Sequence, residues 1–229
     1  MAKNTKKKAK FKPVTIEIPK HKYKKLMENI FKFMGKYNNV LTGINFKVKG
    51  DILTLAATDG MTLLKSEIAL DETAANECEL TLNGFYLWRI KLNVSYEFGR
   101  KKKYRPIDTM LITFNEDSAL FEDKLNGIKY NIPTIKDTTP YPDYEKLIPN
   151  TKENKNYIQV GLNTSYIARL ADISDSRTRM AADISDSRTR MAILNINTKD
   201  QNSAVVVHST DRENNIKNTS LLMPIQLRE

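Results

Sequence analysis

A pattern of one strand, one helix and three further strands recurs along this chain, and it limits the fold more than any other feature of the sequence. Val14–Ile18 alternates apolar and polar residues as a strand does, and Pro19 then opens a helix, a first-turn position that proline favours. We expect three strands to follow, at Gly43–Val48, Ile52–Ala57 and Leu63–Ala69. These five elements form one βαβββ unit.

A second copy of the pattern begins with a strand at Cys78–Leu82. Asn83 is a good N-cap for its helix, and Phe85, Trp88 and Leu92 should lie on one side of that helix. The strands that complete the copy are 110–114, 119–122 and 128–132, with a hairpin turn at Asn126-Gly127. Two copies of one unit indicate two pseudo-equivalent halves of a single domain.

The pattern starts a third time after a polar linker at 151–155. Tyr157–Val160 is a candidate strand, and Asn163 should cap a helix that carries Tyr166, Ile167 and Leu170. The strands expected to close this unit are 193–196, 204–208 and 221–227.

An exact repeat interrupts this third unit, because residues 171–181 and 182–192 both read ADISDSRTRMA. Eleven residues advance a helix by three turns and about 20°, so the copy could lengthen a helix while nearly keeping its faces in phase. Ser174, Asp175 and Ser176 are poor helix formers, and an extruded loop is equally plausible. A perfect copy indicates a recent duplication or a cloning artefact, and no function is assigned to it.

The positive charge is concentrated in two places. The chain has a net charge of +10, but six lysines lie in residues 1–12 and five basic residues in the stretch from Arg100 to Arg105. The remaining 26 basic and 27 acidic residues nearly cancel. A near-neutral body with two basic appendages favours a polyanionic partner, most often nucleic acid, although a solubilising tail and a solvated loop would have the same composition. Residues 1–12 show no apolar periodicity and are expected to be a disordered arm.

The residues that most enzymes need are absent or scattered. The single cysteine, Cys78, excludes an internal disulfide, favours a reducing, cytoplasmic location and is expected to pack in a strand. The two histidines, His21 and His208, have no metal-ligand spacing, and no glycine-rich phosphate loop is present. Asp59 and Asp143 lie in turn-like contexts, where each is expected to bond its own backbone. We therefore predict a protein without catalytic residues, metal or cofactor, and neither a membrane span nor a secretory signal is evident.

The first helix has two distinct faces. Its apolar stripe, at helical spacing, consists of Tyr23, Leu26, Met27, Ile30, Phe31 and Met34. A second face should carry Lys25, Asn29, Lys32 and Lys36. Such a face is either a solvated lysine face or a surface that lies across a phosphate backbone without reading bases.

The end of the chain is apolar, although chain ends are usually polar and frayed. Residues 219–227 read TSLLMPIQL, and something must cover them. The best candidates are the stretches 57–63 (ATDGMTL) and 141–149 (YPDYEKLIP).

These stretches resemble parts of the bacterial beta sliding clamp, the processivity subunit of DNA polymerase III. Residues 57–63 resemble that family's Ala-Thr-Asp-Gly/Ser-His-Arg-Leu motif, preceded by Leu41-Thr42-Gly43. Residues 141–149 are similar to its Phe-Pro-Asp-Tyr…Leu-Pro segment, 161–166 to its Gly-Phe-Asn-x-x-Tyr helix start, and 221–227 to its C-terminal Val-Val-Met-Pro-Met-Arg-Leu. The five matches occur in the family's order and together cover about 14–227.

The resemblance implies an α+β DNA-clamp fold, with antiparallel sheets outside and helices on one face, that forms an oligomeric ring around duplex DNA. It also implies docking of polymerase-type peptides, of the Gln-x-x-Leu-Phe kind, in an apolar cleft; a clamp loader is a further candidate partner. The cleft residues would be Leu41, Thr58, Gly60, Met61, Leu63, Pro142, Lys146, Leu147, Leu221, Leu222, Met223, Pro224 and Ile225. The DNA-facing residues would be Lys25, Asn29, Lys32, Lys36, Arg100, Lys101, Lys102, Lys103 and Arg105.

The sequence also departs from the family pattern. Met61-Thr62 stands where the family has His-Arg, and Gln226 where it has Arg, which could alter peptide preference. The family has three domains of two units each, whereas we expect a basic arm at 1–12, one complete domain at 13–150 and the second half of another at 151–229. That half could pair with the same half of another chain, and four chains would then supply the twelve units of a ring. The alternatives are a clamp-derived peptide-binding adaptor or decoy that encircles nothing, and a generic basic nucleic-acid-binding protein.

Overall fold

The computed structural model describes residues 11–37, 40–90, 96–98, 104–106, 108–135, 140–149, 157–163, 191–197, 205–211 and 215–222. The chain is built of three successive units. The first unit consists of one strand, one helix and three further strands. The first unit comprises β1 (Val14–Pro19), α1 (Lys20–Ile30), the single 3₁₀ turn η1 (Phe31–Phe33), β2 (Gly43–Lys49), β3 (Ile52–Thr58) and β4 (Thr62–Ala69). The second comprises β5 (Cys78–Asn83), α2 (Gly84–Trp88), the hairpin β6 (Tyr96–Phe98) and β7 (Tyr104–Pro106), β8 (Thr109–Phe114), β9 (Ser118–Asp123) and β10 (Ile128–Pro133). A short helix, α3 (Tyr144–Leu147), precedes the third unit, which comprises β11 (Tyr157–Asn163), β12 (Met191–Asn197), β13 (Val205–Asp211) and β14 (Ile216–Leu222).

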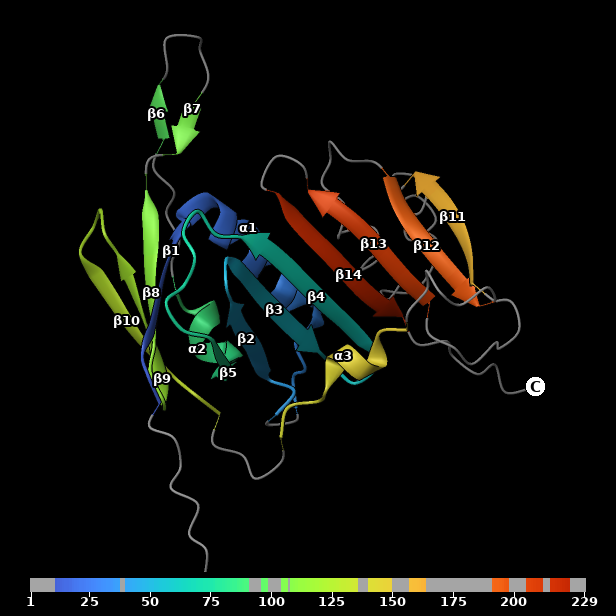
Figure 1. The fold of residues 1–229 in the computed structure, drawn as a ribbon, viewed down its shortest axis with the longest axis horizontal. Coiled ribbons are helices and arrows are strands. Elements are labelled where there is room, and N and C mark those ends of the chain that lie inside the picture. Colours follow the sequence, from blue (N-terminus) through green and yellow to red (C-terminus); the bar gives the residue numbers. More distant parts are fainter. Residues whose placement is uncertain are drawn as a thin grey trace, which may run out of the picture.

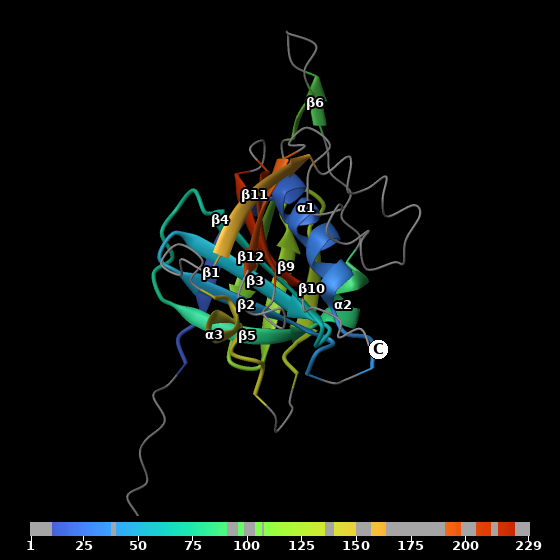
Figure 2. The same ribbon diagram turned by 90° about the vertical axis from the view of Figure 1, so that its right-hand side faces the viewer.

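The strands form two large antiparallel sheets and one small hairpin sheet. The four-stranded sheet has the order β1-β8-β9-β10, and the eight-stranded sheet has the order β11-β12-β13-β14-β4-β3-β2-β5. Figure 1 shows the third unit continuing the sheet of the first unit beyond β4, and Figure 2 shows α1 and α2 beside each other on one side of the molecule. The predicted α+β architecture of antiparallel sheets with helices on one face is confirmed.

The first two units exchange strands. β1 of the first unit pairs with β8 of the second, and β5 of the second unit pairs with β2 of the first. The two sheets then pack on each other, with Phe46 lying 5.9 Å from Phe114 and 6.3 Å from Phe121 between ring centroids. One continuous core therefore contains α1 and both sheets.

Helix α1 follows the predicted stripe, but it is shorter than the stripe. Tyr23, Leu26, Met27 and Ile30 are buried, as amphipathic spacing requires. The α-helix ends at Ile30, and the tighter turn η1 then changes the phase, so that Phe33 is fully buried while Phe31 and Met34 are only partly buried.

A buried lysine fixes the start of α1. The Nζ of Lys20 lies 3.1 Å from Asp108 and 2.6 Å from Asp123, and its side chain is fully buried. Its backbone N–H also donates to the carbonyl of Asp108. Burial disfavours the ammonium, but the two carboxylates outweigh that effect and raise the pKa of Lys20. The first turn of the helix is thereby tied to the second unit.

Helix α2 buries Leu87 but exposes its aromatic residues. Phe85, Tyr86 and Trp88 are exposed, Trp88 to 70%; Leu92, which was expected on the side of Phe85 and Trp88, lies outside the described residues. The cap at Asn83 is confirmed, because its side-chain oxygen accepts from the N–H groups of Phe85 and Tyr86. Hydrophobic spacing in so short a helix does not determine which side is buried.

Two boundaries in the third unit also differ from the predictions. The last strand is Ile216–Leu222 rather than 221–227, and residues 223–229 lie outside the described residues. Asn163 is the last residue of β11, opposite Met191, rather than a residue outside the strand, and the helix expected after it falls in 164–190, which is not described. The exact repeat also lies there, except for Met191 and Ala192, the first two residues of β12.

The turns and the cysteine agree better with expectation. Gly127 has a φ of +65° in the turn between β9 and β10, although the loop is four residues long because Asp123 pairs with Ile128. Cys78 is buried, and this burial raises the pKa of its thiol to about 11. Within the described ranges no helix has the length and apolarity that a membrane crossing requires.

The Lys20 ion pairs generate the first prediction. Lys20→Met should lower the free energy of unfolding by about 3–5 kcal/mol, because it removes the ammonium that neutralises the two buried carboxylates of Asp108 and Asp123. Lys24→Met, on an exposed position of the same helix, should change it by no more than about 0.5 kcal/mol. Urea titration of both variants at neutral pH measures the difference, and equal losses would contradict the assigned role.

A second-site test separates lost charge pairing from lost packing. Adding Asp108→Asn and Asp123→Asn to Lys20→Met should recover part of the stability, since the orphaned charges are removed. Lys20 and Asn126 hold the pKa of Asp123 below its ordinary value despite its burial. The contribution of ionised Asp123 to the free energy of unfolding should therefore be present above the ordinary aspartate pKa. It should be lost as the pH falls through the lower pKa that Asp123 has in the folded protein.

Candidate functional site

Strands β4 and β14 pair in register along their full length, and this β4–β14 junction joins the third unit to the first. Leu63 lies directly opposite Leu221. Side chains at opposed positions share one face of a sheet, so both project to the face away from α1, while Leu64 and Ser220 project to the core face. Leu63 and Leu221 belong to a buried cluster completed by Ala56, Tyr144 and Val206, against which Tyr141 and Ile148 pack.

The segment 140–149, which includes α3, covers this outer face. The hydroxyl of Tyr141 donates to the carbonyl of Ala56 at 3.2 Å, and the hydroxyl of Tyr144 donates to the side-chain oxygen of Asn45 at 3.3 Å. Burial raises the pKa of both tyrosines, so they remain neutral donors. These bonds attach the segment to β2 and β3.

Lys65 provides a third attachment. Its ammonium lies 3.0 Å from Glu67 on the same strand and 3.1 Å from Glu145 in α3. Burial disfavours its charge, but the two carboxylates outweigh that effect and raise the pKa of Lys65. The pair with Glu145 links α3 directly to the outer face of β4.

The turn between β3 and β4 forms the rim of the site. One carboxylate oxygen of Asp59 accepts from the N–H groups of Met61 and Thr62 and from the Thr62 hydroxyl, at 2.9, 2.7 and 3.0 Å. The Thr58 hydroxyl donates to the Thr62 carbonyl at 2.6 Å. Gly60 has a φ of +90°, which favours glycine, and this turn holds Met61 outward with 45% of its surface exposed.

The predicted cleft residues thus form a buried floor and an exposed rim. Thr58, Leu63 and Leu221 are buried, Leu41 and Pro142 are partly buried, and Met61 and Leu147 are exposed. A Cβ on Gly60 would lie 3.6 Å from Leu41, which shows that these two residues are neighbours. Leu222 is described only as part of β14, and Met223, Pro224 and Ile225 lie outside the described residues.

Both turn aspartates interact with nearby backbone groups. Asp59 accepts from the N–H groups of Met61 and Thr62, as predicted. Asp143 pairs mainly with the side chain of Lys146 at 2.8 Å, and this pair, together with backbone hydrogen bonds from Lys146 and Glu145, lowers the pKa of Asp143. Lys146 is 84% exposed and held by this pair at the surface of α3.

The predicted DNA-facing set is only partly brought together. Lys32 is exposed and Lys25 partly buried, but Asn29 is 5% exposed, so its inclusion in an exposed face is wrong. Lys36 is exposed but lies after η1, because the helix ends six residues earlier, at Ile30. The exposed positions of the helix are Lys24 and Glu28, whose spacing was overlooked. Arg105 is described only as part of β7, and residues 100–103 lie outside the described residues.

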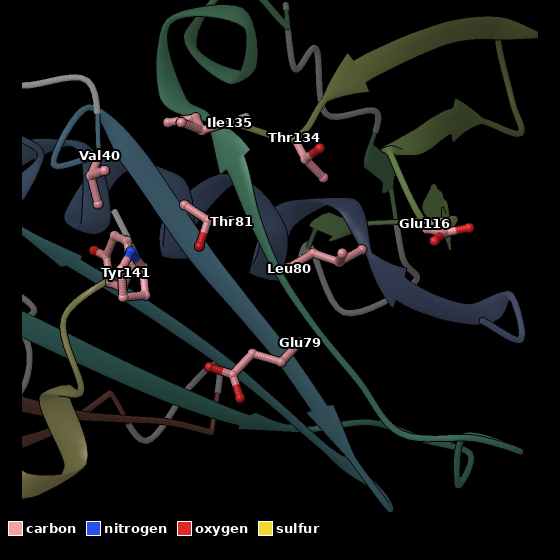
Figure 3. Close-up of a pocket in the computed structure, with 9 residues that line it drawn as sticks. Val40, Glu79, Leu80, Thr81, Glu116, Thr134, Ile135 and Tyr141 are labelled. Atoms are coloured by element: carbon pink, nitrogen blue, oxygen red, sulfur yellow. The ribbon is translucent and has the colours of Figure 1, made fainter. Parts of the chain in front are cut away.

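A hollow of about 260 Å³ lies next to the segment 140–149 but is separate from the predicted cleft. Figure 3 shows Tyr141 on one side of it and Glu116 on the other, with Thr81 of β5 between them. One of its two carboxylates, Glu79, is already bonded to Asn45 at 3.3 Å. The hollow therefore lacks a converging set of polar groups, and across the described ranges no cluster of three or more His, Cys, Asp and Glu could hold a metal ion.

Sequence reasoning missed the residues that secure the segment 140–149. Tyr141, Tyr144 and Lys65 were not among the proposed site residues, although both tyrosines stood in a quoted motif. The strand alternation of β4 places Leu63 and Lys65 on one face, and that signal could have identified Lys65.

The Lys65 attachment generates a prediction about local opening. Lys65→Met should loosen α3 and increase hydrogen exchange at the Ile148 N–H, which donates to the Tyr144 carbonyl, by up to about tenfold. Lys146→Met, which removes only an exposed ion pair, should leave that rate almost unchanged. Native-state hydrogen exchange measures both, and equal exchange in the two variants would contradict the assignment.

Comparisons with known proteins find similarity to beta sliding clamps in sequence and in overall fold. No family model matches the chain. The beta sliding clamp of Borreliella burgdorferi is 26% identical over 162 residues, which are 68% of this chain and 37% of that protein. The chain thus spans well under half the length of this curated relative.

Solved structures of low sequence identity share the fold. The DNA polymerase III beta subunit of Thermotoga maritima superposes with a TM-score of 0.72 at 14% identity, covering 100% of this chain and 70% of that one. A Helicobacter pylori beta clamp in complex with 5-chloroisatin gives a TM-score of 0.68 at 15% identity, with coverages of 96% and 69%. The chain therefore has the fold of the bacterial beta sliding clamps and resembles them in sequence over about two thirds of its length.

Proposed function

We propose that this chain is a sliding-clamp-like, non-enzymatic processivity factor, which holds duplex DNA without sequence specificity and docks polymerase-type peptides at the β4–β14 junction. The observation that carries the proposal is the apolar site itself, with a floor of Leu63 and Leu221 and a rim that exposes Met61. The clamp-like fold and the resemblance of stretches 57–63, 141–149 and 221–227 to clamp motifs support this proposal.

The chemistry of the site supports an apolar, extended peptide. Met61 is exposed, flexible and polarizable, which allows several different side chains to pack against it. Leu147, 55% exposed, faces solvent on α3, while Leu63 and Leu221 of the floor are buried and directly paired between β4 and β14. An adaptable rim over a fixed floor suits a family of related peptides better than one ligand.

The proposed DNA contacts depend on charge rather than on base recognition. Lys24 of α1 and Lys32 of the following turn η1 are exposed, and the chain carries a net charge of +10. Lysine contacts to phosphate are independent of sequence and weaken steeply with salt. Encirclement would need several chains, and four chains of three units would match the twelve units of the related rings. The proposed location is the cytoplasm, where a replication factor of this kind acts.

The peptide site is tested by one charge at its rim. Met61→Asp should weaken binding of a labelled Gln-x-x-Leu-Phe peptide at least tenfold, equivalent to about 1.4 kcal/mol, since a carboxylate would be desolvated against an apolar ligand. Ile128→Asp is the matched control, because Ile128 is 46% exposed on β10, away from the site. Fluorescence anisotropy measures both, and similar affinities for the two variants would contradict the proposed site.

Encirclement is tested with circular DNA. The protein should remain on closed circular duplex DNA after loading at low salt and a wash at moderate salt, and it should leave when the circle is cut once. Loss from both forms, together with intact peptide binding, would indicate an adaptor or decoy instead. Retention on both forms would indicate ordinary basic binding to nucleic acid.

A further inference from the structure

The third unit shows an unusual feature when it is compared with the first two. The first two units exchange their first strands, since β1 lies on β8 and β5 lies on β2. In each case the accepting strand is the second strand of the other unit when the β6–β7 hairpin is left out of the count. In the third unit, the first strand β11 lies on β12, the second strand of its own unit. Figure 1 shows β11 at the far end of the eight-stranded sheet from the first unit.

β11 pairs with β12 in the same way as the exchanged strands β1 and β5 pair with β8 and β2. In each case the pairing is antiparallel, and the start of the first strand lies beside the end of the second. The opposed residues are Val14 with Phe114, Cys78 with Val48, and Tyr157 with Asn197. β11 thus occupies, on its own unit, the place that a strand from a partner unit takes in the first two units.

We propose that two copies of the chain exchange β11, so that the third units of two molecules together form the arrangement that the first and second units form within one molecule. This inference goes beyond the proposed function, because it requires neither DNA nor peptide. The partner is a second copy of this chain, and the interface is a pair of third units related by a two-fold axis.

Exchange would preserve every strand pair. β11 would meet the same residues of β12 in the same register, so no backbone hydrogen bond is lost when the donor is another copy. Domain swapping is a low-cost route to dimers for this reason. The connection available for crossing is residues 164–190, comparable in length with residues 20–42 and 84–108, which join the exchanged strands β1 and β5 to their own units.

The sequence of β11 and β12 supplies a driving force. By register, Val160 lies opposite Leu194, Leu194 opposite Val207, and Val207 is buried. The register pairs 158 with 196, 160 with 194 and 162 with 192, and all six of these alternate positions hold apolar residues. Through the pairing of 194 with Val207, this row of positions continues the row of Val207 along the eight-stranded sheet. An apolar row of this kind is what two paired third units would need in order to pack on each other.

Cross-linking distinguishes exchange from folding back within one molecule. Gln159 and Asn195 are directly opposed polar positions in β11 and β12. In the Gln159→Cys/Asn195→Cys variant, a short bis-maleimide, which alkylates one thiol at each end, should join two chains, giving mainly a two-chain product on a denaturing gel. Cys78 can remain, because its thiol is buried and its pKa is raised to about 11.

The matched control uses the adjacent hairpin. Thr210→Cys/Lys217→Cys joins opposed, exposed positions of β13 and β14, which belong to one chain in either arrangement, and it should give a one-chain product. Gln159→Cys alone reports random cross-links between molecules. Light scattering of the unmodified chain at micromolar concentration should show at least twice the chain mass.

Each result shows whether β11 is exchanged between two copies of the chain. A two-chain product for the 159/195 pair, with a one-chain product for the 210/217 pair, supports exchange. A one-chain product for the 159/195 pair overturns it, as does a strictly monomeric mass. Failure of the 159/195 pair to cross-link while the 210/217 pair does so would also overturn it, because β11 would then not lie on β12. None of these results alters the tests of the peptide site.

Discussion

The pairing of β4 with β14 is the constraint on which the rest of the molecule depends. It converts two groups of four strands into one eight-stranded sheet, and it does so in a register that places Leu63 beside Leu221. Residues more than 150 positions apart in the chain thereby share one apolar surface. The segment 140–149 can then close over that surface, because Tyr141, Tyr144 and Lys65 attach it to strands of the first unit.

The two faces of this sheet are organised by different physical means. The core face is apolar and is covered by α1, whose first turn is oriented by the buried ion pairs of Lys20. Such pairs add little net stability over an apolar replacement, but they fix where the helix begins. On the outer face, hydroxyl and carboxylate groups hold the segment 140–149 over a buried apolar floor, and Met61 and Leu147 are exposed beside it. One face therefore forms the core, and the proposed recognition site belongs to the other.

Much of this arrangement could be predicted from the sequence, and the failures share a physical cause. Alternation and turn residues located β1 to β5 and β8 to β10 closely, with Gly50 and Gly127 marking tight turns, but the short hairpin of β6 and β7 was not predicted. The five motifs indicated the fold and the approximate site. Prediction failed where the local pattern competes with tertiary packing: Asn29 fits an exposed helical face by its spacing but is buried. Strand exchange and the β4–β14 pairing join distant segments, which no local periodicity reveals.

The register of β14 also limits how this chain can change over generations. Leu221 and Ser220 are neighbours in sequence but project to opposite faces, toward the outer cluster and the core respectively. Substitutions can therefore alter the character of the site one side chain at a time. A single inserted or deleted codon within the strand, by contrast, would invert the two faces together. We therefore expect this strand to tolerate a substitution more readily than an insertion or deletion of one residue, and sequence changes to accumulate in the rim and the loops.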